Sequence, residues 1–146
     1  YKHNLHDGIR SGADGNDVLL MHAVSRIMLN NFINNIQISW VKEGGNMSQL
    51  LLTWGANDFG GTLINESIST AAGAKYGQLL KPKQIRNFIR QIGRIPVQRT
   101  TSYKIVQTYE SEKEDVLDKV SDVSQFGSYQ ELIKLDKYKF KSNRRR

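Results

Sequence analysis

The chain alternates between segments with strand-like and helix-like hydrophobic patterns, and this alternation restricts the folds that it can adopt. Residues 36–41 carry β-branched and aromatic side chains on alternate positions, and residues 56–59 and 95–106 also have strand character. Helix-like segments separate them at intervals of roughly 15 to 25 residues, and strands joined by such crossovers pair in parallel. The sequence therefore predicts an α/β fold built from parallel βαβ units.

Three segments have clear helical signals. Asp14 or Asn16 can cap the first of them. Its apolar residues recur with the period of one helix face: Leu20, Ala23, Val24, Ile27 and Met28. The second covers residues 47–54, and the third begins at Pro82 and ends at Gly93. These helices alternate with the predicted strands along the chain.

Two or three βαβ units are too few to close an eight-unit barrel of about 250 residues. The pattern fits a small open sheet or a part of a barrel, and periodicity does not choose between them. A further short helix is predicted over residues 64–72. Residues 110–122 are dense in charge and carry only a thin apolar stripe. We therefore divide the chain into an α/β part, residues 1–106, and a charged helical C-terminal extension with a basic end, residues 107–146.

The positive charge of the chain is concentrated at its C-terminal end. The formal net charge is +7, from 21 basic and 14 acidic residues. Six of the basic residues and none of the acidic ones lie in the last ten positions, so residues 1–136 are close to neutral. A basic end of this kind is usually a solvated terminus. We do not expect nucleic acid to be a partner.

Composition excludes several kinds of chemistry. The chain has no cysteine, which removes disulfides, thiolate metal ligands and thiol nucleophiles. His3, His6 and His22 lack the spacing of a metal-ligand set, and no metal site is predicted. No apolar run approaches the roughly 18 residues of a membrane helix, and no secretory signal is recognisable. We expect a cytoplasmic protein without a membrane partner.

Polar residues follow two of the predicted strands, at the edge where parallel α/β folds bind ligands. Ser39 and Lys42 follow the first strand. Asn57, Asp58 and Thr62 lie in the segment GANDFGGT, residues 55–62, whose two adjacent glycines allow close approach of a ligand to the backbone. The same residues could instead form a tight structural turn. The pattern leaves both interpretations open.

Two further charged residues belong to the candidate site. Glu66 follows GANDFGGT at the start of the next predicted helix. Arg99, beside Thr100 and Thr101, could bind a substrate carboxylate through both arms of its guanidinium group. It could equally pair with an acid such as Asp58 or Glu66. The residues alone do not decide between these roles.

Five ordered segments of the chain resemble a known enzyme family. They are residues 35–42 (NIQISWVK), 55–62 (GANDFGGT), 66–69 (ESIS), 72–77 (AGAKYG) and 93–101 (GRIPVQRTT). Over roughly residues 1–106 the chain is similar to radical S-adenosylmethionine (SAM) enzymes that act on tyrosine-derived or futalosine-type substrates. The wording of these segments looks most like the FO synthase subunit 2 family of deazaflavin (coenzyme F-420) biosynthesis.

The resemblance implies a fold, a reaction and a set of partners. The fold would be the C-terminal portion of a TIM-type barrel. The reaction would join the 4-hydroxybenzyl group of L-tyrosine to 5-amino-6-(D-ribitylamino)uracil, with FO synthase subunit 1 as a companion enzyme. The cofactors would be SAM and a [4Fe–4S] cluster held by a CxxxCxxC loop, whose cysteines this chain lacks. By itself the chain is therefore not expected to cleave SAM.

The resemblance also suggests how the candidate residues are used. Asn57, Asp58 and Glu66 would hold the tyrosine ammonium group or the uracil edge. Ser39 and Lys42 would hold a carboxylate or ribityl hydroxyl groups, with Arg99 positioning a carboxylate. Two alternatives remain: a menaquinone-pathway enzyme acting on aminofutalosine or dehypoxanthine futalosine, and a non-catalytic binding module with a basic tail. Asn65 and Tyr76 depart from the acid and histidine usual in the family.

Overall fold

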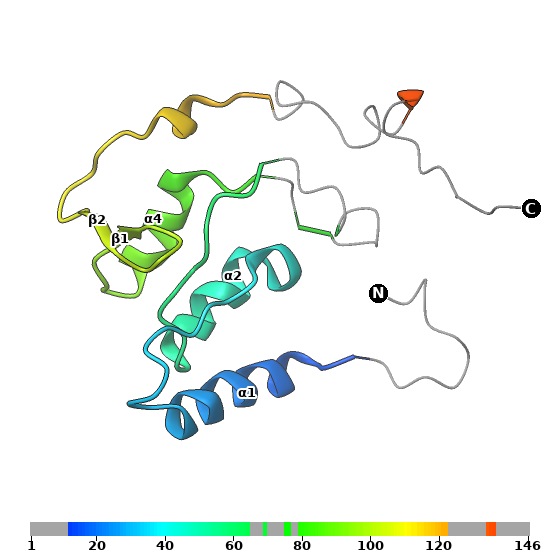
Figure 1. The fold of residues 1–146 in the computed structure, drawn as a ribbon, viewed down its shortest axis with the longest axis vertical. Helices are drawn as coiled ribbons and strands as arrows, with labels where there is room; N and C mark the ends of the chain where they lie inside the picture. Colours follow the sequence, from blue (N-terminus) through cyan, green and yellow to red (C-terminus); the bar gives the residue numbers. More distant parts are fainter. Residues whose placement is uncertain (1–11, 65–68, 70–74, 77–78, 123–133, 137–146) are drawn as a thin grey trace, which may run out of the picture.

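A computed structural model describes residues 12–64, 69, 75–76, 79–122 and 134–136 (Figure 1). Within these ranges the elements follow one another along the chain as three α-helices, a pair of strands and a short 3₁₀ helix. The helices are α1 (Gly15–Met28), α2 (Trp40–Thr53) and α4 (Pro82–Gln91). The strands are β1 (Val97–Arg99) and β2 (Ile105–Thr108), followed by the 3₁₀ helix η2 (Val116–Lys119).

Helix α1 confirms the first predicted helix and has a well-defined start. The Asp14 side chain accepts hydrogen bonds from the backbone N–H groups of Asn16 and Asp17, at 2.8 and 2.9 Å. The Asp17 carboxylate in turn accepts from the backbone N–H of Asp14, which completes a capping box. Asp14, rather than Asn16, is therefore the residue that begins the helix.

Helix α2 begins earlier than predicted, so the expected strand over residues 36–41 is wrong in its second half. The backbone oxygen of Ser39 accepts from the N–H groups of Lys42 and Glu43, which starts a helical turn. Trp40 and Val41 lie in that turn and are both buried. Their alternation resembles a strand, but two adjacent apolar residues at a helix start can also both face a core. The helix continues through a kink at Gly44, whose φ is 78°.

Two extended segments lie in parallel beside each other just before α2 and just after it. The N–H of Asn57 donates to the oxygen of Ile36 at 3.2 Å, and the N–H of Ile38 donates to the oxygen of Asp58 at 3.0 Å. Gln37 and Asp58 form an isolated parallel bridge. The two predicted strands are thus reduced to one bridge in the described part of the chain, but their predicted parallel direction is correct.

Helix α4 confirms the third predicted helix. Pro82 occupies its first turn, where no intrahelical donor is required. Gly93 follows the end of the helix with a φ of 74°, in the left-handed region that glycine adopts without strain. The amide of Gln84 caps the other end by accepting from the backbone N–H of Lys81 at 2.9 Å.

The predicted single strand over residues 95–106 is wrong, because this segment folds back on itself. Strands β1 and β2 pair antiparallel, with Val97 opposite Thr108. The turn between them is closed by a hydrogen bond from the N–H of Thr100 to the oxygen of Lys104 at 2.8 Å. Tyr103 takes a left-handed conformation there, with a φ of 63°. The chain is therefore α/β as predicted, but its described sheet is an antiparallel hairpin.

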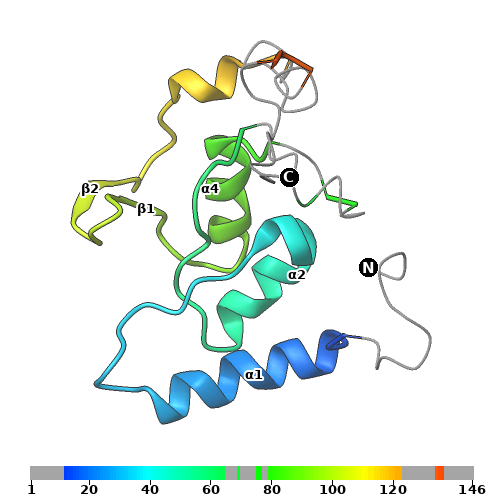
Figure 2. The same cartoon turned by 45° about the vertical axis from the view of Figure 1, so that its right-hand side comes forward.

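The core lies around α2, which is placed between α1 and α4 in both side views (Figures 1 and 2). Its buried residues come from α2 and from the segments that flank it: Ile38, Trp40, Val41, Leu51, Leu52, Ala56, Phe59 and Leu80. Helix α4 packs onto this cluster, and the rings of Phe59 and Phe88 stack with centroids 5.8 Å apart. The predicted helix over residues 64–72 lies almost wholly outside the described residues.

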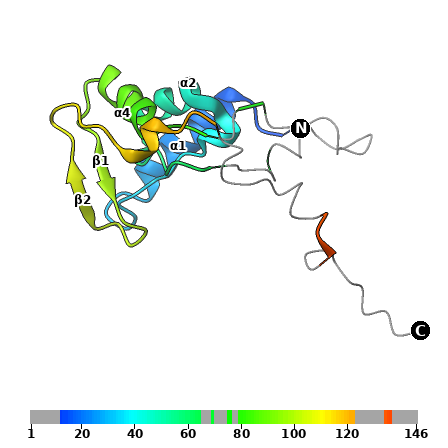
Figure 3. The same cartoon turned by 90° about the horizontal axis from the view of Figure 1, so that it is seen from above.

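The hairpin lies to one side of the helices, and the chain then passes back along α4 (Figure 3). Arg86 of α4 is buried and forms ion pairs with Asp118 at 2.9 Å and with Glu112 at 3.1 Å. The side chain of Arg90 also pairs with Glu112. In the described residues, no helix has the length and apolar character needed to cross a bilayer.

Candidate functional site

The candidate site is organised around an ion pair between Asp58 and Arg99. Asp58 is one of the two residues of the parallel bridge, and its side chain is 7% exposed. Arg99 closes β1 and places its Nε 2.6 Å from Asp58 Oδ2. The other carboxylate oxygen of Asp58 accepts from the N–H of Gly60 at 2.8 Å. Of the pairings that the sequence left open for Arg99, the structure has the one with Asp58.

The guanidinium group of Arg99 is held in a fixed orientation. Its Nη2 donates to Gln37 Oε1 and its Nη1 to the oxygen of Thr100, both at 3.0 Å. The ring of Tyr103 lies under it, with the guanidinium carbon 4.4 Å from the ring centroid. The hydrogen bond to Asp58 raises the pKa of Arg99 above its usual value. The group is therefore permanently charged and pre-oriented.

Part of the Arg99 donor capacity is left for a ligand. A guanidinium group carries five N–H donors. Among the described residues, three of them have acceptors: one on Asp58, one on Gln37 and one on Thr100. One N–H on each terminal nitrogen remains, and the side chain is 26% exposed. Guanidinium N–H groups of this kind are strong donors to carboxylate oxygens.

Asn57 is engaged with the protein through its whole side chain. Its Oδ1 accepts from Arg26 Nη2 at 2.8 Å and from the N–H of Ile36 at 2.9 Å. Its Nδ2 donates to the oxygen of Asn34 at 3.0 Å and to the Asn35 side chain at 3.3 Å. These four hydrogen bonds use its full capacity. In this conformation Asn57 fixes the entry into the first extended segment, and its role toward a substrate stays a prediction.

The remaining candidates with described positions follow the two parallel segments in the sequence. Ser39 caps α2 and Lys42 lies in its first turn, and both are exposed. Thr62 is partly exposed and follows Gly61, whose oxygen accepts from Trp40 Nε1 at 2.9 Å. This bond holds the end of GANDFGGT against the start of α2. Glu66 lies outside the described residues, and its role also stays a prediction.

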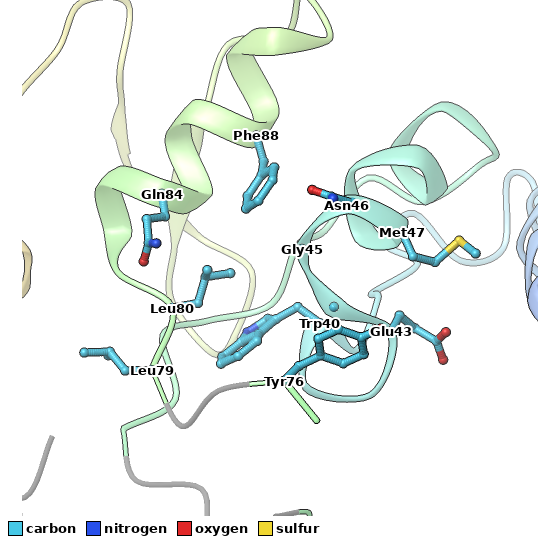
Figure 4. A pocket seen from close by; sticks show the side chains of 11 residues that line it. Trp40, Glu43, Gly45, Asn46, Met47, Tyr76, Leu79, Leu80, Gln84 and Phe88 are labelled. Carbon is cyan, nitrogen blue, oxygen red and sulfur yellow. The ribbon is translucent and has the colours of Figure 1, made fainter. Parts of the chain in front are cut away.

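A pocket adjoins this site between α2 and α4 (Figure 4). It has a volume of about 490 Å³, within the range of pockets that bind small molecules. Trp40, Tyr76 and Phe88 supply aromatic walls, while Glu43 and Gln84 supply polar groups. Since Trp40 both lines the pocket and bonds to Gly61, the pocket and GANDFGGT share a wall.

Sequence reasoning missed three residues that shape the site. Gln37 and Tyr103 orient Arg99, and Arg26 holds Asn57 from helix α1. Arg26 carried a usable signal, because it is the single charged residue in an otherwise uncharged stretch of α1. Gln37 carried a weaker one, as a polar residue between two isoleucines in the first predicted strand. Tyr103 belongs to the cluster of polar residues around the last predicted strand, but its contact with Arg99 depends on the unpredicted hairpin.

The described residues contain no grouping of three or more potential metal ligands among histidine, cysteine, aspartate and glutamate. The complete sequence has no cysteine. Cysteine thiolates are the usual ligands of a [4Fe–4S] cluster. This chain therefore does not supply ligands to such a cluster. The arrangement of Asp58 and Arg99 instead suits binding and orientation of a polar substrate.

Comparisons with known proteins agree with the family resemblance found in the sequence. The family described as "CofH/MqnC C-terminal region" matches residues 4–112. A 5-amino-6-(D-ribitylamino)uracil–L-tyrosine 4-hydroxyphenyl transferase of Methanocaldococcus jannaschii is 51% identical over 98 residues, which cover 67% of this chain and 27% of the relative. Proteins of the same name are 48% identical over 101 residues in Methanococcus maripaludis and 49% identical over 102 residues in Methanopyrus kandleri. These matches cover 69% and 70% of this chain.

The chain spans about 28% of the length of these relatives. No solved structure matches it. The family match extends over most of the chain, from before α1 to beyond the hairpin, and includes the Asp58–Arg99 pair. On this evidence, the chain belongs to the CofH/MqnC C-terminal region family.

Proposed function

We propose that this chain forms one wall of the substrate site in a cytoplasmic transferase that joins the 4-hydroxybenzyl group of L-tyrosine to 5-amino-6-(D-ribitylamino)uracil. The observation that carries the proposal is the Asp58–Arg99 pair within the matched region, in which two N–H donors of an oriented guanidinium group have no acceptor among the described residues. The relatives that bear the name of this transferase support the choice of substrates. The family also includes MqnC in its description, so a menaquinone-pathway reaction is the second candidate.

Within the proposed site, Arg99 binds the carboxylate of L-tyrosine. Asp58 and Gln37 hold the guanidinium plane, and Tyr103 stacks beneath it. Such pre-orientation lowers the entropy lost on binding and fixes the position of the substrate's reactive carbon atoms. Ser39 and Lys42 at the start of α2 and Thr62 at the end of GANDFGGT supply polar groups for the ribityl hydroxyls.

In the proposed architecture this chain is the C-terminal portion of a TIM-type barrel. The parallel direction of the segments before and after α2 supports it, since such pairing needs a helical crossover. The implied [4Fe–4S] cluster and SAM would supply the radical chemistry, with the cluster ligands coming from outside this chain. The residues described above bind and orient the substrates, and the pocket beside Trp40 offers aromatic walls to their aromatic portions.

The proposal is tested in a full-length enzyme. In a chimera, this chain replaces the matched region of the M. jannaschii transferase. Arg99→Lys keeps the charge but loses the fork geometry, so KM for L-tyrosine should rise by about tenfold or more. Arg90→Lys is the matched control, because Arg90 is also paired with a carboxylate but lies away from the site. The KM of the Arg90→Lys variant for L-tyrosine should stay unchanged.

Iron and sulfide content separates a binding role from a structural one. Asp58→Asn should reduce product formation, since it releases the Arg99 guanidinium group from its orientation, and should leave the cluster content of the chimera unchanged. Loss of cluster and product together would make Asp58 a structural residue only. An unchanged KM for L-tyrosine in Arg99→Lys would contradict the proposed carboxylate site. Turnover of a futalosine-type substrate instead of L-tyrosine would favour the second candidate.

A further inference from the structure

Helix α1 exposes apolar side chains on the side that faces away from the core. They continue past the end of the helix, and their exposed fractions lie between 46% and 86%: Leu20, Met21, Val24, Ile27, Met28, Phe32 and Ile33. We refer to these seven residues as the α1 face. Figures 1 and 2 show α1 at the edge of the molecule, and no other described element covers its outer side.

The sequence of α1 is that of a helix buried on all sides. A surface helix normally has charged residues on the face opposite its core. From residue 18 to residue 33 the single charged side chain is Arg26. Arg26 is directed inward, where its Nε donates to the oxygen of Gly55 at 2.7 Å. Between residues 18 and 33, no charged residue therefore remains for the outer side of the helix.

The inner side of α1 is already occupied by this chain. Val18 and Leu19 pack against the buried cluster around α2. Gly55 lies so close to α1 that a Cβ atom there would be 2.8 Å from the oxygen of His22. Helix α1 thus has two apolar sides: the inner side packs against this chain, and the α1 face is the outer one. An apolar surface of this extent on one element indicates an interaction site.

We propose that the α1 face packs against the N-terminal part of the longer polypeptide that the family's full-length members possess. The matched family is a C-terminal region, and the relatives extend far beyond the 27–28% of their length that this chain matches. Such a partner presents apolar helices or strands rather than charges, which fits a face that has no charged side chain. The inference rests on the proposed placement in a longer enzyme, but its test measures packing and not turnover.

The three methionines of the chain report on this packing without any substitution. Met21 and Met28 belong to the α1 face, with exposed fractions of 66% and 70%, whereas Met47 lies inside the fold against the core. The chain alone and the chimera with the M. jannaschii transferase are treated with hydrogen peroxide, and sulfoxide formation is followed by peptide mass spectrometry. Oxidation of Met21 and Met28 should be at least about fivefold slower in the chimera, with Met47 unchanged. Equal rates for Met21 and Met28 in the two proteins overturn the proposal.

A matched pair of substitutions provides the second measurement. Ile27 and Ile105 are similarly exposed, at 75% and 72%, but Ile105 lies on the hairpin. Ile27→Lys should lower the unfolding temperature of the chimera and restore fast oxidation of Met28, whereas Ile105→Lys should do neither. In the chain alone, both variants should unfold like the unchanged chain. If Ile27→Lys leaves the chimera unaffected, the face is not covered by the N-terminal part.

Sedimentation of the chain alone distinguishes the other possible occupant, a second copy of this chain. Protection of Met21 and Met28 that grows with the concentration of the isolated chain, together with a dimer that Ile27→Lys dissociates, would overturn the proposal in favour of self-association. A monomer with freely oxidised Met21 and Met28 supports it. Because none of these measurements depends on product formation, a failed Arg99 test would leave this inference standing.

Discussion

At the scale of single residues, Gly55 sets the distance between α1 and the core, and Gly93 provides a comparison. Gly55 has a φ of 110°, and a Cβ atom there would lie 2.8 Å from both the oxygen of His22 and the Cβ of Arg26. Gly93 also has a positive φ, of 74°, but no atom lies within 4 Å of the corresponding Cβ position. A Cβ atom at Gly93 would thus cause backbone strain alone, whereas one at Gly55 would cause both strain and steric overlap.

Substitution by alanine should therefore have different effects at these two glycines. Gly93→Ala should lower the free energy of unfolding by about 1–2 kcal/mol, the cost of a left-handed conformation for a residue with a Cβ atom. Gly55→Ala adds an overlap with backbone, and its effect should be clearly larger because α1 must move. Urea denaturation of both variants measures the difference. Equal effects would show that α1 adapts freely at Gly55.

At the scale of elements, ion pairs hold the segment after the hairpin against helix α4. Burial opposes the charge on Arg86, but the hydrogen bonds and charges of Asp118 and Glu112 outweigh it and raise the pKa of Arg86. Burial likewise opposes ionisation of Asp118, and hydrogen bonds from the N–H groups of Asp115 and Lys83 and from Arg86 nevertheless lower its pKa. Tyr109 places its ring 4.9 Å from the Arg86 guanidinium carbon.

The stability that these ion pairs contribute should decrease as the pH falls. Because the pKa of Asp118 is lower in the folded chain than in the unfolded chain, its contribution is complete above about pH 5 and is lost as the pH falls below about 4. Asp118→Asn should lower the free energy of unfolding by about 2 kcal/mol at pH 7, and the difference from the unchanged chain should shrink in acid. Denaturation from pH 7 to pH 3 tests this. A difference that is constant with pH would assign the loss to packing.

The matched control for this variant is Glu114→Gln. Glu114 pairs with Lys119 at 3.4 Å, but both side chains are about 70% exposed. Exposed ion pairs contribute little to stability. Glu114→Gln should therefore unfold like the unchanged chain at every pH. A loss of stability equal to that of Asp118→Asn would mean that burial of the Arg86 cluster has no special importance.

At the scale of the whole molecule, the boundary predicted at residue 106 remains a prediction, and the contacts of α4 give a way to test it. Residues 1–106 would lose both acids that pair with Arg86, which is 4% exposed. A buried charge left without a partner is strongly destabilising. We therefore expect residues 1–122 to be more stable than residues 1–106 by roughly 3 kcal/mol or more.

Thermal unfolding of the two truncated chains measures this difference, with Arg86→Leu introduced into both. If the acids act by pairing with Arg86, the leucine variant should bring the stabilities of the two lengths closer together. Equal stability of residues 1–106 and 1–122 without that substitution would support a domain boundary at residue 106. It would also mean that the residues after 106, which include the second half of β2, add no stability to the fold.

The sequence singled out GANDFGGT and the end of the preceding segment from their own composition, but it left a binding site and a structural turn as alternatives. The pairing of Asp58 with Arg99 was one of several alternatives, since the two residues are 41 positions apart and Asp58 could bind other groups equally well. The fixed orientation of Arg99 was not predictable at all. It depends on Tyr103, whose position follows from a turn that interrupts an apparently continuous strand.

The sequence by itself determined the elements whose signals are local. Pro82 begins α4, Gly93 ends it, and the cap of α1 is narrowed to Asp14 or Asn16, because caps, proline and glycine act within a few residues of the positions that they affect. Family membership is likewise determined by ordered local segments. These features would be the same in any arrangement of the helices.

Only the tertiary structure decided what the ambiguous segments became. Trp40 and Val41 have strand propensity but lie in a helix, since burial of both against the core outweighs propensities worth less than about 1 kcal/mol. Residues 95–106 form a hairpin because Tyr109 and Arg99 are anchored to α4 and to Asp58 at distant positions. The physical reason is common to both: local preferences are small, and the packing of residues far apart in the sequence determines the result.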